Sequence, residues 1–486
     1  MLFRVKKILH IEYLKRIQVF HSFIPTILNN LSYFLLLLLL PIHLLACTQT
    51  DSVPDIKKKN TNDSISGQLS LKQCIRFALQ NEPLLRQSLI DQDIAEKDIQ
   101  LRLADWFPQV NIGNTLEHFI KKPVSAFPNI ANPSAGVSYI STGLYNNNTL
   151  GLSATQNIFS NSLRIAAITA RFYRSQASQN TDQVRIKLVS NVSKAFYDLL
   201  LSRQQLLVID EDILRLQGNT KIAQALYQLG TNDPIDYDQS IIALNNSISQ
   251  RFTISETINY KFSFLRQLMG YPLVKPLELQ FDSLLLTKET NIDTLLPLES
   301  GRRIEYTQLQ TTIALLRENY SFYKYNFLPT VSAFGNFNLV NQNDHLNHLF
   351  DRNFPNSVIG LTLSLPVFQG NKRIYNMKRA ALTLKRSSLD EIQLKNTIQT
   401  EYVLALGTYK SYLNQYRLNT KNVSIARHVY KVVLLQYQQG IKPYLNLIQA
   451  ETDLRTSQLN MLNSLFELLS SKLDLQVATG TLETKV

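Results

Sequence analysis

The residue types that usually carry catalysis are scarce in this sequence and are not arranged for it. Beyond residue 46 the chain has only four histidines: His118, His345, His348 and His428. His345 and His348 lie in a polar stretch where Asp344 is the only added carboxylate and no cysteine accompanies them. The sequence contains neither a phosphate-binding P-loop nor the Gly-x-Ser-x-Gly turn of a hydrolase. We therefore expect no enzymatic activity, no metal site and no cofactor.

The two cysteines have different surroundings. Cys47 follows an apolar run, residues 33 to 46, which is preceded by a basic segment as in a secretory signal. The run is too short for a comfortable membrane-spanning helix. It ends Leu-Leu-Ala before Cys47, which resembles the lipobox of bacterial lipoproteins. We predict a lipoprotein signal peptide over 1 to 46 and lipidation of Cys47, which would attach the chain to a membrane. The alternative is an ordinary signal or anchor helix with an incidental cysteine.

Residues 47 to 66 are polar and poor in apolar side chains, so they are predicted to be a tether. Cys74, which lies beyond it, is expected to be a small buried residue on a helix.

The positive charge of the chain is dispersed. The net charge is +13, and residues beyond 46 contribute 45 basic and 36 acidic side chains. No dense cluster of lysine and arginine with interleaved aromatic residues occurs, so we expect no nucleic-acid partner. The chain has only 15 glycines and 16 prolines, which leaves room for long uninterrupted helices.

Two stretches separated by 210 residues carry the same heptad pattern. Steps of four and three residues from Leu188 to Tyr227 meet apolar residues everywhere except Ser202 and Thr220. The same steps from Ile398 to Tyr437 meet Asn419 as the only strongly polar residue. The correspondence predicts a duplicated unit, with one repeat over residues 67 to 290 and the other over 291 to 486.

Each heptad seam lies in a helical pattern of about 68 residues, or roughly 100 Å of helix. A helix of this length cannot fold back on a compact core, so we expect a coiled assembly. Strand-like alternation precedes each long helix, over residues 108 to 159 and 329 to 368, with a polar loop from Ile120 to Asn148 in the first pair.

These strands are apolar on one face and polar on the other. Such strands suit a membrane barrel, although a soluble sheet with one packed face would fit the alternation equally well. Four strands cannot close a wide barrel, so the membrane interpretation requires several chains to share one sheet.

The turns that follow the long helices also correspond. They are expected at about 229 to 236 and 439 to 446, where Gly230 and Gly440 end the helices. Asp236 and Asn446 each lie six residues after the glycine, and a helix cap is one interpretation of both.

The whole pattern resembles the TolC family of outer membrane efflux and secretion ducts over almost all of residues 67 to 480. The resemblance rests on Leu71 to Pro83, on the strand entry Trp106 to Val110, on the Tyr-Gln-x-Gly turns, and on the strand exits Ile158-Phe159 and Val367-Phe368. It implies a mainly α-helical chain with a transmembrane β-barrel. Three chains would contribute four strands each to a 12-stranded barrel, continued by an α-helical periplasmic tunnel. An equatorial region would include parts of 272 to 299 and the C terminus.

The resemblance also implies a gate at the periplasmic tip. The gate tyrosine corresponds to Tyr437 and a basic gate residue to Lys442. The positions of the family's acidic ring correspond to Asn446 and Gln449, which are neutral. Closure is therefore expected to use neutral hydrogen bonds together with Lys442, whose side chain would reach Asp233, Asp236 or Asp238. The hairpin tips, with Gly230, Asp236, Gly440 and Pro443, would dock an adaptor.

The resemblance thus implies a passive, lipid-anchored outer membrane duct of a tripartite efflux or type I secretion system. It would form a homotrimer and export small molecules or ions received from a periplasmic adaptor and an inner membrane transporter. The alternative is a lipid-anchored periplasmic coiled-coil adaptor or scaffold without a pore. An adaptor would be expected to interpose a β-rich, lipoyl-like module within one hairpin, whereas each half of this chain has its own hairpin and strand pair.

Overall fold

We describe the chain from a computed structural model, within which residues 68–128, 136–230, 233–273, 277–280, 290 and 298–484 are described. Residues 68 to 486 form one compact unit. Cys47, the predicted signal peptide and the predicted tether lie outside the described residues, as does most of the predicted equatorial segment after residue 273. None of the helices in the described ranges combines the length and the apolar content needed to cross a membrane.

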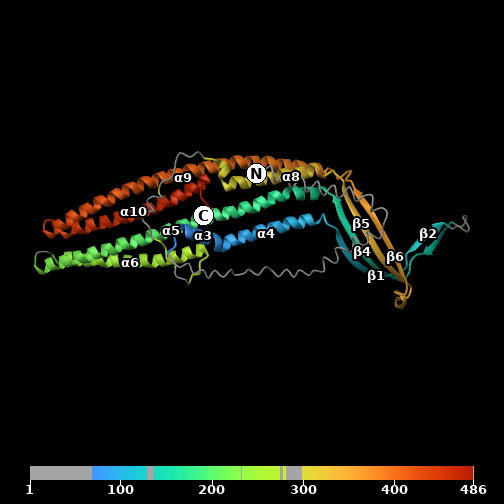
Figure 1. The fold of residues 1–486 in the computed structure, drawn as a ribbon, viewed down its shortest axis with the longest axis horizontal. Helices are drawn as coiled ribbons and strands as arrows, with labels where there is room; N and C mark the ends of the chain where they lie inside the picture. The colour runs from blue at the N-terminus through green and yellow to red at the C-terminus, as the bar shows by residue number, and fades with distance from the viewer. Residues whose placement is uncertain are drawn as a thin grey trace. The chain divides into compact units, whose positions relative to one another are not determined.

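The first half of the unit runs through two helices, a strand pair and a long helical hairpin (Figure 1). Its helices are α3 (Leu71–Asn81), α4 (Pro83–Ala104), α5 (Asn161–Gln228) and α6 (Pro234–Met269), and its longer strands are β1 (Gln109–His118) and β4 (Asn146–Phe159). Ser70 caps α3 in a reciprocal capping box with Gln73. Ser160 caps α5 by accepting a hydrogen bond from the Leu163 amide.

The second half follows the same order. A short turn of 3-10 helix, η2 (Ser300–Arg302), leads into α8 (Ile304–Lys324) and β5 (Thr330–Asn343). The turn η3 (Leu346–His348) separates β5 from β6 (Asn353–Ser364), after which come α9 (Lys372–Gln438) and α10 (Tyr444–Thr479). The 68 residues of α5 and the 67 residues of α9 confirm the predicted long helices.

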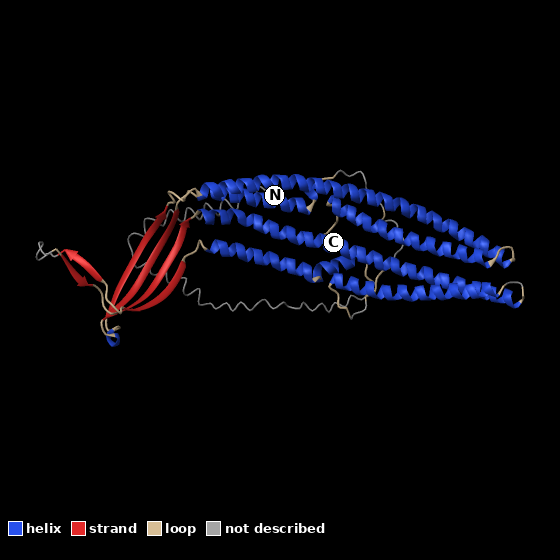
Figure 2. Ribbon diagram, turned by 180° about the vertical axis from the view of Figure 1, so that it is seen from behind, coloured by secondary structure: helices blue, strands red, loops and turns tan. Residues whose placement is uncertain are grey.

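The four longer strands form one antiparallel sheet in the order β1-β4-β5-β6, which confirms the four predicted strands (Figure 2). The prediction of a plain loop from Ile120 to Asn148 was wrong. That segment contains a separate hairpin of β2 (Val124–Pro128) and β3 (Val137–Ser141), and β4 already begins at Asn146. The hairpin strands have five residues each and lie among prolines, so their alternation is too short to stand out from a loop.

The helices nearest the sheet repeat the order of the strands. α4 packs on α5, α5 on α8, and α8 on α9. Towards the hairpin turns, α6 packs on α5, α5 on α10, and α10 on α9. The sheet lies at one end of these helices and both hairpin turns lie at the other (Figure 1).

The heptad seams are the buried faces of the long helices. Val192, Leu199 and Ile209 of the first seam are fully buried, and so is Ile398 of the second. The main core gathers the middle of α5 with α3, the end of α6 and the second half of α10. Cys74 is fully buried in it, as predicted, and burial raises the pKa of its thiol to about 12. Tyr227 departs from the pattern because it is 45% exposed and stacks on Tyr237.

Two glycines end the returning helices α6 and α10 at points where each packs closely against the backbone of an earlier segment. Gly270 ends α6 with φ +64°, and a Cβ there would lie 2.6 Å from the Asn81 carbonyl oxygen, between α3 and α4. Gly480 ends α10 with φ +69°, and its Cβ would lie 2.7 Å from the Arg302 carbonyl oxygen. Only glycine suits both the left-handed backbone and the close approach.

Candidate functional site

The two hairpin turns have the same backbone geometry. Gly230 and Gly440 both adopt φ +70°, and each amide donates to the carbonyl oxygen three residues earlier, of Tyr227 and of Tyr437. No atom would obstruct a Cβ at either glycine, so the positive φ alone favours glycine there. The turns are therefore built by the same local rule in both halves.

Tyr437 is the anchor of the second tip. It is 1% exposed, and its ring meets that of Tyr444 edge to face at 5.5 Å between centroids. Both tyrosines pack with Val433 and Leu447 in a small core of their own. Burial raises the pKa of Tyr444 well above its ordinary value, so its hydroxyl stays neutral. The returning helix is thus fixed to α9 one turn from the tip.

The other predicted gate residues lie on the surface of this tip. Asn446 and Gln449 are exposed and Lys442 is half-buried. Gln449 donates to the Oδ1 atom of Asp453 over 2.9 Å. Lys442 forms no ion pair with any side chain in the described part of the chain, so the expected link to an aspartate of the first tip is not made within one chain.

The capping interpretation of Asp236 and Asn446 was wrong. Asp233 caps α6 by accepting a hydrogen bond from the Ile235 amide, and Pro443 occupies the cap position of α10 without a side-chain bond. Asp236 and Asn446 are the third helical residues instead. Pro234 is the first residue of α6, where proline is favoured, and Pro443 immediately precedes α10, so both helices begin before Asp236 and Asn446.

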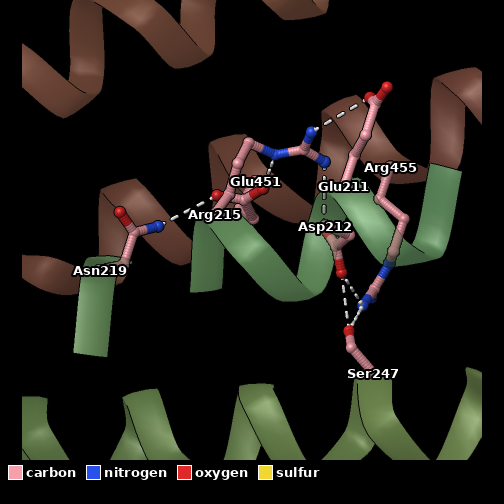
Figure 3. A network of polar contacts seen from close by, with 7 residues as sticks. All are labelled: Glu211, Asp212, Arg215, Asn219, Ser247, Glu451 and Arg455. Carbon is pink, nitrogen blue, oxygen red and sulfur yellow. Dashed lines mark hydrogen bonds and ion pairs between the residues drawn. The ribbon is translucent and has the colours of Figure 1, made fainter. Parts of the chain in front are cut away.

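A buried polar network lies in the hairpins away from the turns and joins three helices (Figure 3). Arg215 of α5 donates from Nε to Oε1 of Glu451 of α10 over 2.6 Å, and Asn219 donates to the other carboxylate oxygen over 3.0 Å. The members are Glu211, Asp212, Arg215 and Asn219 of α5, Ser247 of α6, and Glu451 and Arg455 of α10.

Asp212 is the second centre of the network. It is fully buried and accepts hydrogen bonds from the Ser247 hydroxyl at 2.7 Å and from Arg455 at 3.3 Å. Arg215 reaches its other carboxylate oxygen at 3.3 Å. Two buried carboxylates thus face two guanidinium groups, which satisfies the rule that buried charge must be paired.

Burial dominates the acid–base chemistry of this layer. It raises the pKa of Glu451, although the hydrogen bond from Arg215 opposes the shift. It also raises the pKa of Tyr430, on α9, to about 12. The Arg215 guanidinium lies 5.9 Å from the centre of the Tyr430 ring, so the layer reaches all four helices of the two hairpins.

The network is not duplicated. The residues 210 positions after Asp212, Arg215 and Asn219 are Asn422, Ile425 and Val429, and those 210 before Glu451 and Arg455 are Ile241 and Asn245. The charges therefore belong only to the contact between the two halves. Sequence analysis missed them, since charged residues three, four or seven apart on a helix usually form a solvated face.

Comparison with known proteins identifies the family. A family model described as outer membrane efflux protein matches residues 74–270 and 305–481. The chain belongs to the outer membrane efflux protein family. A comparison with curated protein sequences gave no match.

Solved structures of efflux channels share the fold. CusC aligns with a TM-score of 0.67 at 18% identity, over 84% of this chain and 91% of its own. VceC of Vibrio cholerae gives 0.66 at 17%, over 84% and 96%. The CmeC outer membrane channel of Campylobacter jejuni gives 0.68 at 16%, over 86% and 87%. The predicted family, the long helical hairpins and the four-stranded sheet are therefore confirmed, and this efflux channel is a transport protein and not an enzyme.

In this efflux channel the two edge strands of the sheet, and the helices next to them, lack a covering partner within the described chain. β1 pairs only with β4, and β6 only with β5, among the described strands. The adjoining edge helices expose apolar residues: Ile90, Ile94 and Leu101 on α4, and Tyr375, Leu382 and Leu389 on α9. Unpaired strand edges and exposed apolar stripes both require a covering partner.

Proposed function

We propose that the chain is the outer membrane duct of a tripartite efflux or type I secretion system. Three copies close a 12-stranded barrel and a helical tunnel, and the duct passively exports small molecules or ions. The observation that carries the proposal is that both lateral edges of the chain lack a partner. β6 and α9 of one copy can cover β1 and α4 of the next. Strand order up, down, up, down makes each such junction antiparallel, as a closed barrel needs.

The membrane position follows from the sheet. Large apolar side chains on one of its faces are exposed, including Ile112 at 74% and Leu361 at 72%. Lipid would cover this face, and the opposite polar face would line the pore. The helices then extend into the periplasm, with the hairpin tips at the far end.

The tips are the proposed docking sites of a periplasmic adaptor, which connects the duct to an inner membrane transporter. Leu229, Ile441 and Leu445 are 64 to 75% exposed around Gly230, Asp236, Gly440 and Pro443. Exposed aliphatic residues at a rigid turn are a suitable apolar contact for a partner helix. The transporter supplies the energy, since the family is not enzymatic.

Closure of the tip is proposed to use two layers. At the turn, Tyr437 anchors α10 to α9, while Lys442, Asn446 and Gln449 face the neighbouring copies around the aperture. The Arg215–Glu451 layer holds α10 against α5. A neutral ring at Asn446 and Gln449 needs no cation to relieve repulsion between copies, which favours closure by hydrogen bonds.

Purified protein tests this function directly. We expect trimers by mass in detergent and discrete conductance steps in planar bilayers. Stable trimers without conductance in any tip variant would favour the other candidate, a lipid-anchored coiled-coil scaffold without a pore. The unpaired β1 and β6 edges argue against that scaffold, because a soluble protein would leave them open to aggregation.

Attachment through Cys47 is proposed from the lipobox alone. Labelled palmitate should enter the wild-type chain and not Cys47→Ala, and the variant should still form trimers, because the fold of residues 68 to 486 is a compact unit by itself. Label in both chains would contradict lipidation at this residue. Repeat boundaries at 67, 290 and 486 likewise remain proposals, supported by the matching element order of the two halves.

A further inference from the structure

The polar face of the sheet carries a single formal charge. Glu117 lies opposite Asn147 in the β1–β4 pairing, and Asn147 lies opposite Gln342 in the β4–β5 pairing. These three residues form one row near the end of the sheet away from the helices. Gln342 donates to the Asn147 side chain over 3.4 Å, so the row shares one face.

The rest of that face is neutral. The rows towards the helices contain hydroxyls and amides, among them Thr115, Thr149, Ser153, Asn336 and Asn338. Asn338 donates across the sheet to the Asn356 side chain over 3.0 Å. Among the residues of the four sheet strands, Glu117 is the only acidic one, and no lysine or arginine occurs.

Glu117 is also not neutralised. It is exposed, and it forms no ion pair with any described residue. The nearby Lys122 is occupied, because its Nζ lies 2.6 Å from Asp344 Oδ1 and 4.2 Å from the centre of the Tyr145 ring. Among the described residues, the Glu117 carboxylate therefore has no cationic partner in this polar lining.

The hairpin tips lie at the other end of the molecule. The second-hairpin positions of the expected aperture ring, Asn446 and Gln449, are neutral, and the tip acids Asp233, Asp236 and Asp238 belong to the first hairpin. We propose that Glu117 sets cation selectivity at the outer mouth of this duct, as a ring of three carboxylates. The inference rests on the proposed trimeric pore, which brings the three copies together. Rings of carboxylates around a pore favour cations because they raise the local cation concentration.

Reversal potentials of the full-length channel in planar bilayers under an asymmetric KCl gradient test this role. Glu117→Gln should lower the potassium to chloride permeability ratio by roughly two- to fivefold, the size expected for removal of one exposed unit charge per chain in water. Asn147→Asp adds a carboxylate to the same row and should raise the ratio. Both side chains are at the pore surface, so neither change should disturb folding.

The double variant Lys122→Gln with Asp344→Asn is the matched control. It removes an ion pair of zero net charge that lies outside the strands, so it should leave the ratio unchanged. A conducting Glu117→Gln channel with the wild-type ratio would overturn the assignment, as would an equal effect of the double variant. A wild-type protein that forms no channel would instead contradict the proposed function.

Discussion

Arg215 and Glu451 form a hydrogen-bonded ion pair, with 2.6 Å between Nε and Oε1, at the only layer where buried charges of the described chain join its two halves. Glu451 is 2% exposed and Asp212 is fully buried, so bulk water does not solvate either carboxylate. The attraction within the pair therefore contributes less to stability than the cost of leaving one of its buried charges without a partner.

Removal of one partner from this pair should destabilise the hairpins. Arg215→Ala leaves a buried carboxylate unpaired and should lower the free energy of unfolding by about 3 kcal/mol. The pair of Arg251 with Asp210 has the same 2.6 Å separation but is exposed, so Arg251→Ala should cost less than about 1 kcal/mol. Thermal unfolding in detergent measures both.

The double variant Arg215→Met with Glu451→Leu is a further control. Because it removes both charges, it should recover much of the lost stability. If Arg215→Ala unfolded at the same temperature as Arg251→Ala, burial would not govern the strength of this layer.

The pH dependence of stability should reveal Glu451. Burial raises its pKa above the ordinary value of 4.5, so the folded chain binds this proton more tightly than the unfolded chain does. The stabilising contribution is full below pH 4.5 and is lost as the pH rises through the raised pKa. Glu451→Gln should remove that part of the pH profile. Unfolding temperatures across this range, compared between the two proteins, measure it.

The exposed carboxylate of Glu96 should contribute to stability with the opposite pH dependence. Arg174 lowers the pKa of Glu96 through a hydrogen bond, so any contribution from Glu96 is lost as the pH falls. Glu96→Gln should therefore leave the loss of stability at rising pH intact. A profile for Glu451→Gln that matches the wild type would show that this carboxylate titrates normally.

The glycines that end α6 and α10 should resist substitution. Gly270→Ala places a Cβ 2.6 Å from a backbone oxygen at positive φ, and should cost about 1 to 3 kcal/mol of stability. Gly218→Ala, within α5 and with no atom within 4 Å of its Cβ, should instead add roughly 0.5 to 1 kcal/mol. Thermal unfolding of the two variants gives the comparison, and equal effects would mean that the α3–α4 kink moves freely.

Long-range periodicity made the helices predictable. The seam from Leu188 and its copy from Ile398 each span about six heptads, so the pattern is clear whatever the helix propensity of single residues. The helix ends near Gly230 and Gly440 followed from the turn residues. The cap positions were harder to predict, because Asp236 and Asn446 satisfied the general preference for a cap although the caps are Asp233 and Pro443.

The network around Asp212 and Glu451 could not be predicted. Its residues are 239 positions apart in sequence and meet only through the packing of α5 on α10, which no helical period encodes. The hairpin of β2 and β3 escaped for the opposite reason, since its pattern is too short. Glu117 was visible in the sequence as a polar residue of a strand, but its isolation as a charge depends on the sheet register.

Tyr437 offers a direct test of the proposed gate. Its ring is 1% exposed and packs on Tyr444, so Tyr437→Ala leaves a cavity that should detach the start of α10 and cost roughly 3 to 5 kcal/mol locally. The tip should then open more readily, and single-channel conductance in planar bilayers should rise above that of the wild type. Lys442→Ala should raise it as well if this lysine holds neighbouring copies together.

Tyr227, the equivalent residue of the first half, provides the control. It is 45% exposed and stacks on Tyr237 at the surface, so Tyr227→Ala removes little packing and should leave conductance near the wild-type value. Tyr437→Phe keeps the ring and should do the same. If Tyr437→Ala and Lys442→Ala channels conduct like the wild type, the gate assignment is wrong, and the Arg215–Glu451 layer is then the remaining candidate for closure because it also holds α10 in place.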